Sequence, residues 1–531
     1  MNESVDVAIV GYGPVGQLLA ILLGQRGWRV QVLERWPEPY PLPRAVHFDH
    51  EIGRILQLAG VADALAGRTV PAPIYEWRNA KGDTLIRFGR DTERSLSGWP
   101  ESSMFCQPEL ERILDERVRE LPNVSVERGC EAVALRGTQD AVEIGARRAD
   151  GSATLARSRF AVGCDGANSF VREQIGSGWH DLGFHFDWLV VDVLPSDPRW
   201  EGPLNWQLCD PARPTTLVSG GPGRRRWEFM RLPHETLEEL NSEEAAWRLL
   251  AAWGVHPGNA KLERHAVYTF RARWADRWRN GRALIAGDAA HQMPPFAGQG
   301  MCAGMRDAAN LAWKLDLVLA GRASETLLDS YPSERAGHVD AMIQLSVALG
   351  RVICVADPEE AAARDLRMAA EARERRSPLE TQLPALGPGC FADGSPAAGQ
   401  LFVQDQVRAG ARAGLFDDVV GRGFALVSPR GDPALGLDPE LAAWFDSLGG
   451  ITAHVANGGP IEDLSGGYAR WFDARGVAVV LQRPDGYVFG SAPKLEDAGS
   501  LLGALRERLT RFTTIQTASG RAAPTSSSHK Y

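Results

Sequence analysis

The sequence predicts an α/β protein with a discontinuous, Rossmann-like nucleotide-binding domain, an inserted and mainly antiparallel β-sheet domain, and a smaller C-terminal domain. Three observations lead to this fold class. Residues 5–34 have the pattern of a strand, a glycine turn, a helix, a strand and a terminal acid, which is one βαβ unit. Segments within residues 188–232 alternate apolar and polar side chains, as antiparallel strands do. Residues 282–321 return to strand, turn and long helix, so the first domain resumes after the insertion.

Length, charge and cysteine content narrow the class of protein. At 531 residues the chain is too long for one hydrophobic core, so we expect two or three domains. A net charge of -9 argues against nucleic-acid binding, because a surface that follows phosphates needs excess Lys and Arg. Seven cysteines without a CxxC pair predict no metal site or dithiol and fit a reducing cytoplasm. The N-terminus shows neither a signal peptide nor a membrane span, so we expect a cytoplasmic protein that does not bind membranes.

Changes in composition place the domain boundaries. Residues 377–400 are dense in proline and glycine, which indicates a linker or a surface crossing. The amphipathic segment 331–350 could be a homodimer face or could pack within the chain. We predict a nucleotide-binding domain in three pieces, residues 1–75, 100–180 and 276–385, and a sheet domain in two pieces, residues 76–99 and 181–275. A small α/β domain is expected over residues 398–515, followed by a disordered tail over residues 516–531.

The glycine motif at residues 11–16 predicts a pocket for an adenine dinucleotide. Gly11 allows a tight turn, Gly13 lets the backbone approach a pyrophosphate, and Gly16 lets helix and strand pack closely. Pro14 and Val15 open the helix, whose first N–H groups face the phosphates. Glu34, followed by Arg35, can accept hydrogen bonds from ribose hydroxyls and would repel a 2'-phosphate. The motif alone does not distinguish FAD from NAD, and a glycine turn that merely packs is the alternative.

Two later motifs separate these cofactors. The segment GCDGANSFVR places Asp165 and Gly166 after a strand, and GDAAHQMPPFAGQGM places Gly287 and Asp288 at a strand end. The second segment then leaves backbone N–H groups near a helix start, suited to pyrimidine carbonyls and a reduced, anionic flavin. We expect His291 to fix this turn through a backbone hydrogen bond. The residues expected at the flavin ring are Pro295, Gly298, Gln299, Gly300 and Met301.

These three motifs resemble those of the flavoprotein aromatic hydroxylases with the para-hydroxybenzoate hydroxylase fold. Within that group the chain is most similar to the 3-(3-hydroxyphenyl)propanoate hydroxylases, on stretches such as PRAVHFDHE, FCQPELE and RRWEFMRLPHETLEEL. The resemblance implies that Glu34 binds the adenosine ribose of FAD, and that Arg44 and Gln107 hold the phosphates and the ribityl region. It also implies that Asp288 binds the ribityl chain, and that Asp165 and Gly166 contact both flavin and pyridine nucleotide. A C-terminal thioredoxin-like domain is implied as well, and no cysteine follows Cys390 to make it redox-active.

The resemblance further implies a monooxygenase reaction. NADH or NADPH would reduce FAD as a co-substrate, and O₂ would then form a flavin C4a-hydroperoxide. A phenol ring would attack the distal oxygen and become an ortho-diol. The aromatic substrate implied is 3-(3-hydroxyphenyl)propanoate or a related 3-hydroxyphenyl acid.

Candidate catalytic and substrate-binding residues follow from position and chemistry. His47 could help deprotonate the phenol, with Asp49 in the same stretch and Pro295 in the flavin loop as further catalytic candidates. A hydrogen-bonded structural histidine is the alternative for His47. Trp206, Trp227 and Phe229 could wall the substrate pocket, although packing within the sheet explains each of them as well. Arg213 and the run 224–226 could pair with a substrate carboxylate, although such arginines are often solvated or in surface pairs.

Two other functions remain open at this stage. The same flavin chemistry could hydroxylate a larger aromatic or polyketide, or insert oxygen beside a ketone in a Baeyer–Villiger reaction. A non-catalytic flavin-binding protein that acts through its C-terminal domain is the third reading, against which the intact glycine and acid motifs weigh.

Overall fold

The computed structural model describes residues 4–39, 44–90, 92, 95–202, 204–374 and 384–518. The chain divides into two compact units, which are described separately. The first unit contains Met1–Ala312 and Ala336–Pro384, and the second contains Trp313–Arg335 and Ala385–Tyr531. Residues 313–335 were expected in the nucleotide-binding domain but group with the second unit.

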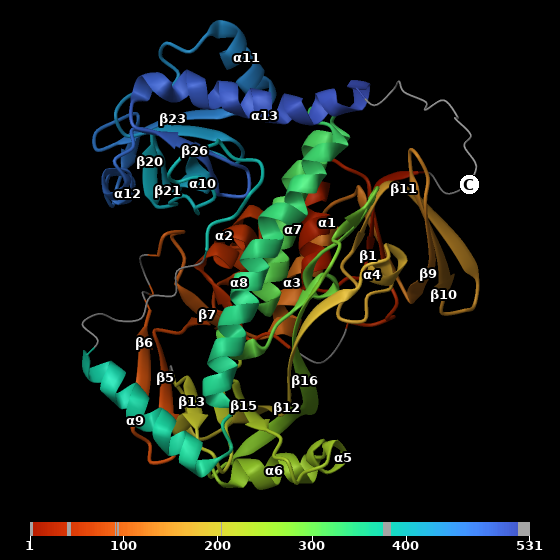
Figure 1. The fold of residues 1–531 in the computed structure, drawn as a ribbon, viewed down its shortest axis with the longest axis vertical. Coiled ribbons are helices and arrows are strands. Elements are labelled where there is room, and N and C mark those ends of the chain that lie inside the picture. Colours follow the sequence, from red (N-terminus) through yellow and green to blue (C-terminus); the bar gives the residue numbers. More distant parts are fainter. Residues whose placement is uncertain are drawn as a thin grey trace, which may run out of the picture. The chain divides into compact units, whose positions relative to one another are not determined.

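The first unit is built on two eight-stranded sheets (Figure 1). One sheet has the order β17-β18-β11-β1-β2-β8, with β10 and β9 attached to β11. β1 runs parallel to both β11 and β2, which is the βαβ topology expected from residues 5–34. Its strands are β1 (Val5–Val10), β2 (Val30–Glu34), β8 (Val124–Arg128), β9 (Cys130–Gly137), β10 (Val142–Arg148), β11 (Ala153–Gly163), β17 (Arg279–Asn280) and β18 (Ala283–Ile285).

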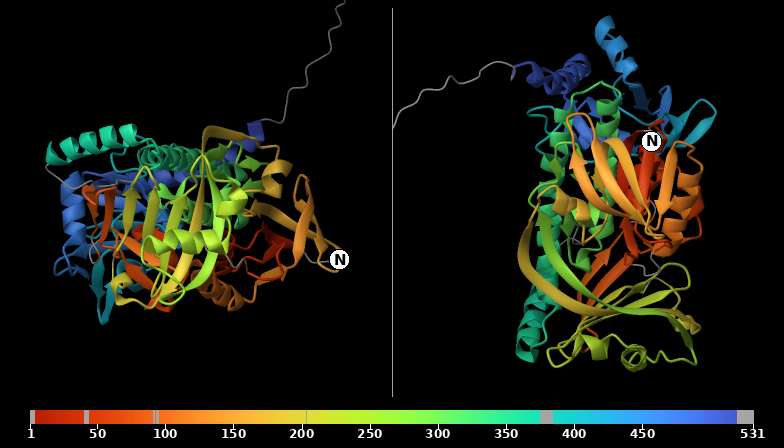
Figure 2. Two further views of the ribbon diagram at one scale, coloured as in Figure 1. Left: turned by 90° about the horizontal axis from the view of Figure 1, so that it is seen from below. Right: turned by 90° about the vertical axis from the view of Figure 1, so that its right-hand side faces the viewer.

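The other sheet is the inserted one, and it is mostly antiparallel. Its order is β19-β16-β12-β15-β14-β13-β5-β6, and Figure 2 shows the long strands β12 and β16 curving along it. One face packs on helices α5 (Leu237–Leu240) and α6 (Glu243–Ala251) through a buried apolar cluster. The strands are β5 (Ile74–Asn79), β6 (Thr84–Gly89), β12 (Trp179–Pro195), β13 (Trp206–Cys209), β14 (Thr215–Ser219), β15 (Arg225–Met230), β16 (Ala260–Ala275) and β19 (His291–Gln292).

Helices and a small sheet complete the first unit. α1 (Pro14–Gly24) packs on α3 (Gln107–Arg119), where the Gln17 side-chain amide donates to the Glu111 carbonyl at 3.1 Å. The order of the small sheet is β3-β7-β4. The remaining elements are β3 (His47–Asp49), β4 (Thr69–Pro71), β7 (Ser102–Phe105), α2 (His50–Leu58), α4 (Phe170–Gln174) and α9 (Pro358–Glu374), with α7 (Gly300–Leu319) as far as Ala312 and α8 (Ser330–Ile353) from Ala336. The other residues of α7 and α8 belong to the second unit.

The amphipathic segment 331–350 lies within α8 and directs its apolar side chains inward. Val339, Ile343 and Val347 are buried in the chain, which agrees with packing within the chain rather than with a free dimer face. Among the described residues no single helix is long and apolar enough to cross a membrane. A pair bent by 115°, Glu325–Ile353 with Pro358–Glu371, meets that criterion only in combination.

The second unit holds a seven-stranded mixed sheet in the order β21-β20-β24-β23-β22-β25-β26. This is the thioredoxin-like domain that the resemblance implied. Its helix α13 runs to Ala518, into the start of the tail predicted at 516–531, and residues 519–531 lie outside the described residues. Its elements are β20 (Gln406–Ala409), β21 (Arg412–Leu415), β22 (Ala425–Ser428), β23 (Ile451–Ala456), β24 (Ile461–Asp463), β25 (Val479–Gln482), β26 (Val488–Ala492), α10 (Phe416–Val419), α11 (Pro439–Ser447), α12 (Gly467–Arg475) and α13 (Ala498–Ala518).

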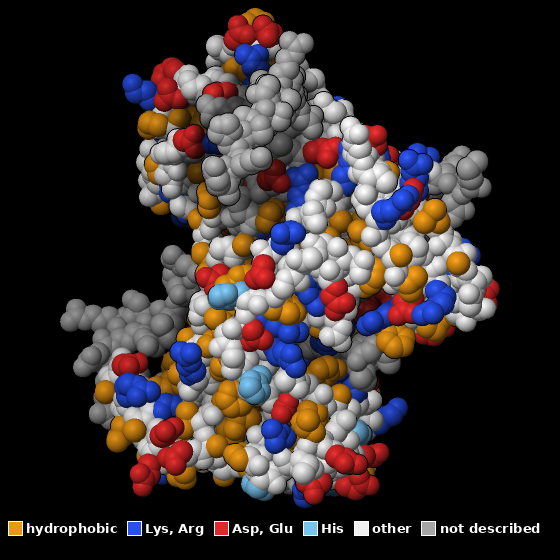
Figure 3. Space-filling view, turned by 45° about the vertical axis from the view of Figure 1, so that its right-hand side comes forward, with side chains coloured by type: hydrophobic (Ala, Val, Ile, Leu, Met, Phe, Trp, Pro, Cys, Tyr) orange, Lys and Arg blue, Asp and Glu red, His pale blue; other side chains and the backbone are white. Residues whose placement is uncertain are grey.

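Acidic and basic side chains are intermixed on the face of the molecule drawn in Figure 3. This pattern agrees with the modest net charge of the sequence.

Candidate active site

A cavity of about 1620 Å³ lies within the first unit and collects most of the residues singled out from the sequence. The expected residues that line it are Gly11, Gly13, Pro14, Val15, Glu34, Arg35, Arg44, His47, Asp49, Gln107, Asp165, Gly166, Asp288, Pro295, Gly298, Gln299, Gly300 and Met301. Gly16 and Gly287 lie behind this wall. Segments separated by almost 300 residues therefore meet at one cavity.

The three glycines at the start of α1 differ in the space around them. Gly11 has φ +100°, and a Cβ there would lie 2.4 Å from the Cys164 carbonyl oxygen. A Cβ on Gly16 would lie 2.2 Å from the Gly11 carbonyl oxygen, so both positions are closed by backbone. A Cβ on Gly13 would meet nothing within 4 Å, although Gly13 lines the cavity. No side chain of the described residues caps α1 at Gly13, so its first N–H groups are open to an anion.

Glu34 lies at the end of β2 beside the glycine turn. Its carboxylate accepts hydrogen bonds from the backbone N–H of Tyr12 at 2.7 Å and of Trp36 at 2.9 Å. These bonds orient the carboxylate at the cavity wall, where it can accept further bonds from ribose hydroxyls.

The Gly287–Asp288 turn is held by a buried carboxylate from α7. The Asp307 carboxylate accepts from the Gly287 N–H at 3.0 Å, and His291 Nε2 lies 2.7 Å from the same oxygen. His291 therefore does fix the turn, but through Asp307 and not through the backbone bond expected from the sequence. The turn presents Asp288 at the cavity, where its carboxylate lies 3.4 Å from Arg44 Nη1.

Two further expected residues are fixed by local hydrogen bonds. The Gln107 side-chain oxygen accepts from the backbone N–H groups of Arg44 at 2.9 Å and of Ala45 at 2.7 Å, which anchors the segment that carries Arg44. The Asp165 carboxylate accepts from the Ser169 hydroxyl at 2.5 Å and from the Val171 N–H at 3.0 Å. Asp165 thus shapes its turn, while Gly166, with φ +78°, faces open space at the cavity.

The loop that ends at the start of α7 is held by a buried network centred on Arg306. Its guanidinium donates to Asp49 at 2.5 Å, to Glu51 at 2.6 Å and to the Gln299 side-chain oxygen at 2.8 Å. Gln299 in turn donates to Asp49 at 3.0 Å. Burial would raise the pKa of Asp49, but the Arg306 charge overcomes it and holds this pKa below its usual range. Asp49 therefore positions the loop, and its pairing with Arg306 argues against the role of catalytic base considered from the sequence.

His47 borders the cavity in a defined tautomer. Its Nδ1 lies 3.3 Å from the Gly298 carbonyl oxygen, and because a carbonyl only accepts, Nδ1 carries the proton. Nε2 is then an unprotonated acceptor. Burial, and after it the charge of Arg90, lower the pKa of His47 to about 4, so the ring is neutral near pH 7. Gly298 has φ +65°, and a Cβ there would lie only 2.7 Å from His47 Nδ1.

The four substrate-binding candidates lie outside the cavity wall. Trp227 and Phe229 are buried in the cluster on the helix-covered face of the inserted sheet, against which Trp206 also packs. The Arg213 guanidinium forms a two-pronged ion pair with Glu235, with both N–O distances at 2.7 Å. The strands were recognised, but side chains alternate between two faces, and Trp206, Trp227 and Phe229 lie on the face turned away from the cavity, while Arg213 lies in the connection between β13 and β14.

The cavity face of the same sheet carries residues that sequence reasoning missed or placed differently. Arg226, part of the run 224–226, is buried and bound to Asp192 at 2.7 and 3.0 Å, so it is already paired. Glu228, two residues on, lines the cavity. Alternation along β15 puts Glu228 on the face opposite Trp227 and Phe229, but it does not tell which of the two faces meets the cavity. The other side chains on the wall that were not expected include Tyr75, Trp77, Arg90, Thr216, Phe270 and Phe296.

All seven cysteines are free thiols, and each is buried or partly buried. Burial raises the pKa of every one of them: Cys106, Cys130, Cys164, Cys209, Cys302, Cys354 and Cys390. Within the described part of the chain, no group of three or more His, Cys, Asp or Glu side chains is placed to hold a metal ion.

The cavity fits a dinucleotide with a second, ring-shaped end. The open side of Gly13 and the uncapped start of α1 suit a pyrophosphate, and the start of α7, from Gly298 to Met301, borders the far part of the same cavity. Glu34 and Asp288 each place a carboxylate on the cavity wall. This arrangement defines a flavoprotein that binds FAD.

Comparison with known proteins identifies the family. Residues 4–346 match the family described as "FAD binding domain", and residues 399–508 match the "HcaD C-terminal domain". The chain belongs to this FAD-binding family, and within it to the FAD-dependent aromatic monooxygenases, which use NADH or NADPH as co-substrate.

Two relatives cover nearly the whole chain. A protein of Rhodococcus jostii (strain RHA1) named "Probable NADH-specific resorcinol 4-hydroxylase" is 39% identical over 521 residues, which are 97% of this chain and 96% of its own. A "3-(3-hydroxy-phenyl)propionate/3-hydroxycinnamic acid hydroxylase" of Mycobacterium sp. (strain JLS) is 35% identical over 539 residues, 95% of this chain and 92% of its own. The second name agrees with the resemblance found in the sequence, whereas resorcinol was not foreseen.

Solved structures confirm the fold. The flavin-dependent monooxygenase PieE, in complex with FAD and substrate, superposes with a TM-score of 0.78 at 22% identity, covering 96% of this chain and 100% of its own. Aklavinone-11 hydroxylase, with FAD and aklavinone, gives 0.76 at 24% identity over the same shares.

Proposed function

We propose that this protein hydroxylates a phenol that carries a substituent meta to its hydroxyl, adding the new hydroxyl ortho to the first. Both relatives are named for substrates of this class, 3-(3-hydroxyphenyl)propanoate and resorcinol. We further propose NADH as the reductant, in line with the name of the Rhodococcus protein.

The observation that carries this proposal is the state of His47 at the cavity wall. A neutral imidazole with its proton on Nδ1 offers Nε2 as an acceptor to a phenol hydroxyl. Removal of the hydroxyl proton makes the phenol ring a stronger nucleophile at its ortho carbon. The Gly298 carbonyl keeps the imidazole in the productive tautomer. His47 is thus our candidate for the catalytic base.

Arg90 supplies a positive charge on the same side of the cavity. It follows β6, is partly buried, and its side chain makes no hydrogen bond or ion pair with another described residue. Burial, and after it the charge of Arg90, lower the pKa of His47, and both residues line the same cavity. A cation in this position would stabilise the phenolate that forms as the proton leaves.

The flavin and the remaining residues of the cavity wall have different functions. FAD, once reduced, supplies activated oxygen, and the protein must orient the ring and exclude water. Phe270 and Phe296 line the cavity, with ring centroids 6.2 Å apart, and provide an apolar wall. The loop held by Arg306 supplies backbone groups at the start of α7 for the flavin ring.

The test is a panel of phenols scored for stimulated NADH consumption, with products identified by mass. We expect resorcinol, 3-(3-hydroxyphenyl)propanoate or both to accelerate NADH oxidation and to gain one oxygen atom as an ortho-diol. A His47→Asn variant that retains FAD should bind substrate but lose most of this product. Ester formation from a ketone, or oxidation of NADH with peroxide as the sole product for every meta-substituted phenol, would refute the proposal.

A further inference from the structure

One carboxyl group on the cavity face of the inserted sheet accepts no hydrogen bond from any residue that the structure describes. Glu228 lies in the middle of β15, is only 8% exposed, and lines the cavity. In the described part of the chain its side chain accepts no hydrogen bond, and the nearest cationic atom, Arg226 Nη1, lies 3.7 Å away. Burial raises the pKa of Glu228, the charges of Arg226 and Arg264 lower it, and the charge of Asp192 raises it. A buried carboxyl in this condition is costly unless a ligand or water supplies a donor.

The polar groups beside Glu228 are committed to other partners. Arg226 donates to Asp192 and, at 2.7 Å, to the Arg44 carbonyl. Thr216, directly across from Glu228 on β14, donates its hydroxyl proton to Gln207 at 2.7 Å. The neighbours therefore shape the surroundings of Glu228 and leave its acceptor capacity to the cavity.

Glu228 belongs to the surface on which an aromatic substrate would lie. Val190 and Thr216, its partners on the neighbouring strands, both line the cavity, as do Trp77 and Tyr75 of β5. Burial, and after it the charge of Glu228, raise the pKa of the Tyr75 phenol, whereas the charge of Arg90 lowers it. The charges of Glu228 and Arg90 thus both act on Tyr75, and these two residues are separate charged groups on the cavity wall.

We propose that Glu228 is a specificity-determining residue that accepts a hydrogen bond from a second, neutral hydroxyl of the substrate. This inference rests on the proposed function and deepens it: the substrate class is a 1,3-dihydroxybenzene, in which His47 takes the proton of one hydroxyl and Glu228 binds the other. A substrate carboxylate would meet a like group at Glu228 and would lose affinity there.

The experiment measures binding without turnover, from the change in the FAD absorption spectrum as a phenol is titrated into the oxidised holoenzyme. The probes are resorcinol, 3-methylphenol, which replaces the second hydroxyl with a methyl group of similar size, and 3-(3-hydroxyphenyl)propanoate. We expect the wild type to bind resorcinol about tenfold or more tightly than 3-methylphenol, the amount expected for one hydrogen bond to a carboxylate.

Two variants and a control isolate the contribution of Glu228. Glu228→Leu should bring the two affinities within about twofold of each other, and Glu228→Gln, which keeps an acceptor oxygen and the shape, should retain part of the preference. Glu76→Gln makes the same change on the same sheet, where Glu76 pairs with Arg78 and does not line the cavity, and it should leave the ratio as in the wild type.

The outcomes separate this inference from the proposed function. Equal wild-type affinities for resorcinol and 3-methylphenol, or a preference that survives Glu228→Leu, would overturn the role of Glu228. Tighter wild-type binding of 3-(3-hydroxyphenyl)propanoate than of resorcinol would overturn the substrate class. If the binding preference holds but NADH yields no hydroxylated product, the proposed function falls and the assignment of Glu228 stands.

Discussion

Replacement of Arg306 by methionine tests whether the flavin loop depends on the buried network beneath it. The guanidinium is 2% exposed and binds two buried carboxylates, Asp49 and Glu51, as well as the side chain of Gln299. Methionine fills similar volume but removes the Arg306 cation from both carboxylates. Breaking a buried ion pair in this way costs about 3–5 kcal/mol, so we expect a loss of unfolding free energy of that size and weaker retention of FAD.

The pH dependence gives the prediction a sign. In the wild type Arg306 holds the pKa of Asp49 below its unfolded value of about 3.9, so this contribution to stability is present above that pH and is lost as the pH falls through the native value. In the variant the charge and the hydrogen bond of Arg306 are gone, so burial raises the pKa of Asp49 against less opposition, although Gln299 still donates to this carboxyl. The folded variant therefore binds a proton more readily than the folded wild type does, so its deficit should shrink, and not grow, as the pH falls from about 8 to about 5.5.

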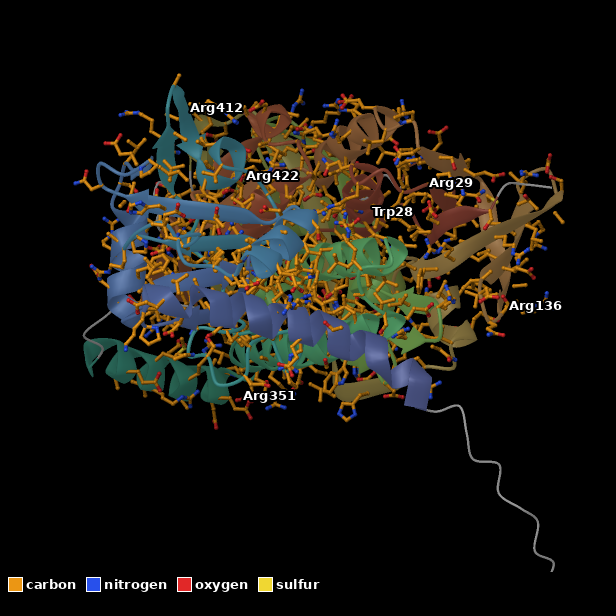
Figure 4. The ribbon with its side chains drawn as sticks, turned by 90° about the horizontal axis from the view of Figure 1, so that it is seen from above. Trp28, Arg29, Arg136, Arg351, Arg412 and Arg422 are labelled. Atoms are coloured by element: carbon orange, nitrogen blue, oxygen red, sulfur yellow. The ribbon has the colours of Figure 1, made fainter. Side chains whose placement is uncertain are left out.

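The assay is urea unfolding of the holoenzyme, followed by circular dichroism and FAD fluorescence at both pH values. Arg136→Met is the matched control, because Arg136 also pairs with a carboxylate, Glu143 at 2.7 Å, but is 75% exposed on β9 (Figure 4). Exposed pairs contribute about 0–1 kcal/mol, so this variant should unfold nearly as the wild type does. If Arg306→Met unfolds at the same urea concentration as Arg136→Met, or if its deficit grows at low pH, the reasoning fails.

Three further predictions follow from the cavity wall. Gly13→Ala should fold normally but bind FAD at least about tenfold more weakly, because its Cβ enters space suited to the pyrophosphate. Gly16→Ala should instead lose about 2 kcal/mol of stability, because its Cβ collides with the Gly11 carbonyl. Equilibrium FAD titration and urea unfolding separate the two effects. Gly298→Ala should cost about 1 kcal/mol of stability for its left-handed φ, and it should lower turnover because its Cβ displaces His47. Unchanged turnover in a variant whose crystal structure shows the new Cβ would contradict the collision with His47. His47→Asn should lower the rate of product formation by about 10²–10⁴, and the wild-type rate should show no loss from His47 protonation between pH 6 and pH 8, because its pKa of about 4 leaves it neutral there; an inflection near pH 6.5 that disappears in His47→Asn would refute the lowered pKa.

Features that depend on neighbouring residues were predictable from the sequence. The roles of Gly11, Gly13 and Gly16 follow from one turn and one helix, and the structure shows the same division among closed and open positions. The carboxyl ends of the parallel strands then gather the acid motifs at one edge, so the FAD-binding wall could be outlined without coordinates.

Features that depend on distant contacts were not predictable. Asp49 resembled a catalytic acid or base because Arg306, 257 residues away, gives no local sign that it neutralises this carboxylate. The substrate wall was missed for a different reason. The alternation in β15 shows two faces, but nothing in the strand says which face meets helices and which meets a cavity, so Trp227 was chosen and Glu228 was not.

The environment of the seven cysteines has a consequence for the lifetime of such an enzyme. A flavoprotein that reduces oxygen releases hydrogen peroxide whenever the activated oxygen is not transferred to a substrate. Peroxide attacks thiolates, and a thiol whose pKa is raised by burial is almost entirely protonated at neutral pH. We therefore expect the thiols of this protein to stay reduced while it releases hydrogen peroxide. Thiol titration after prolonged uncoupled turnover would measure this tolerance.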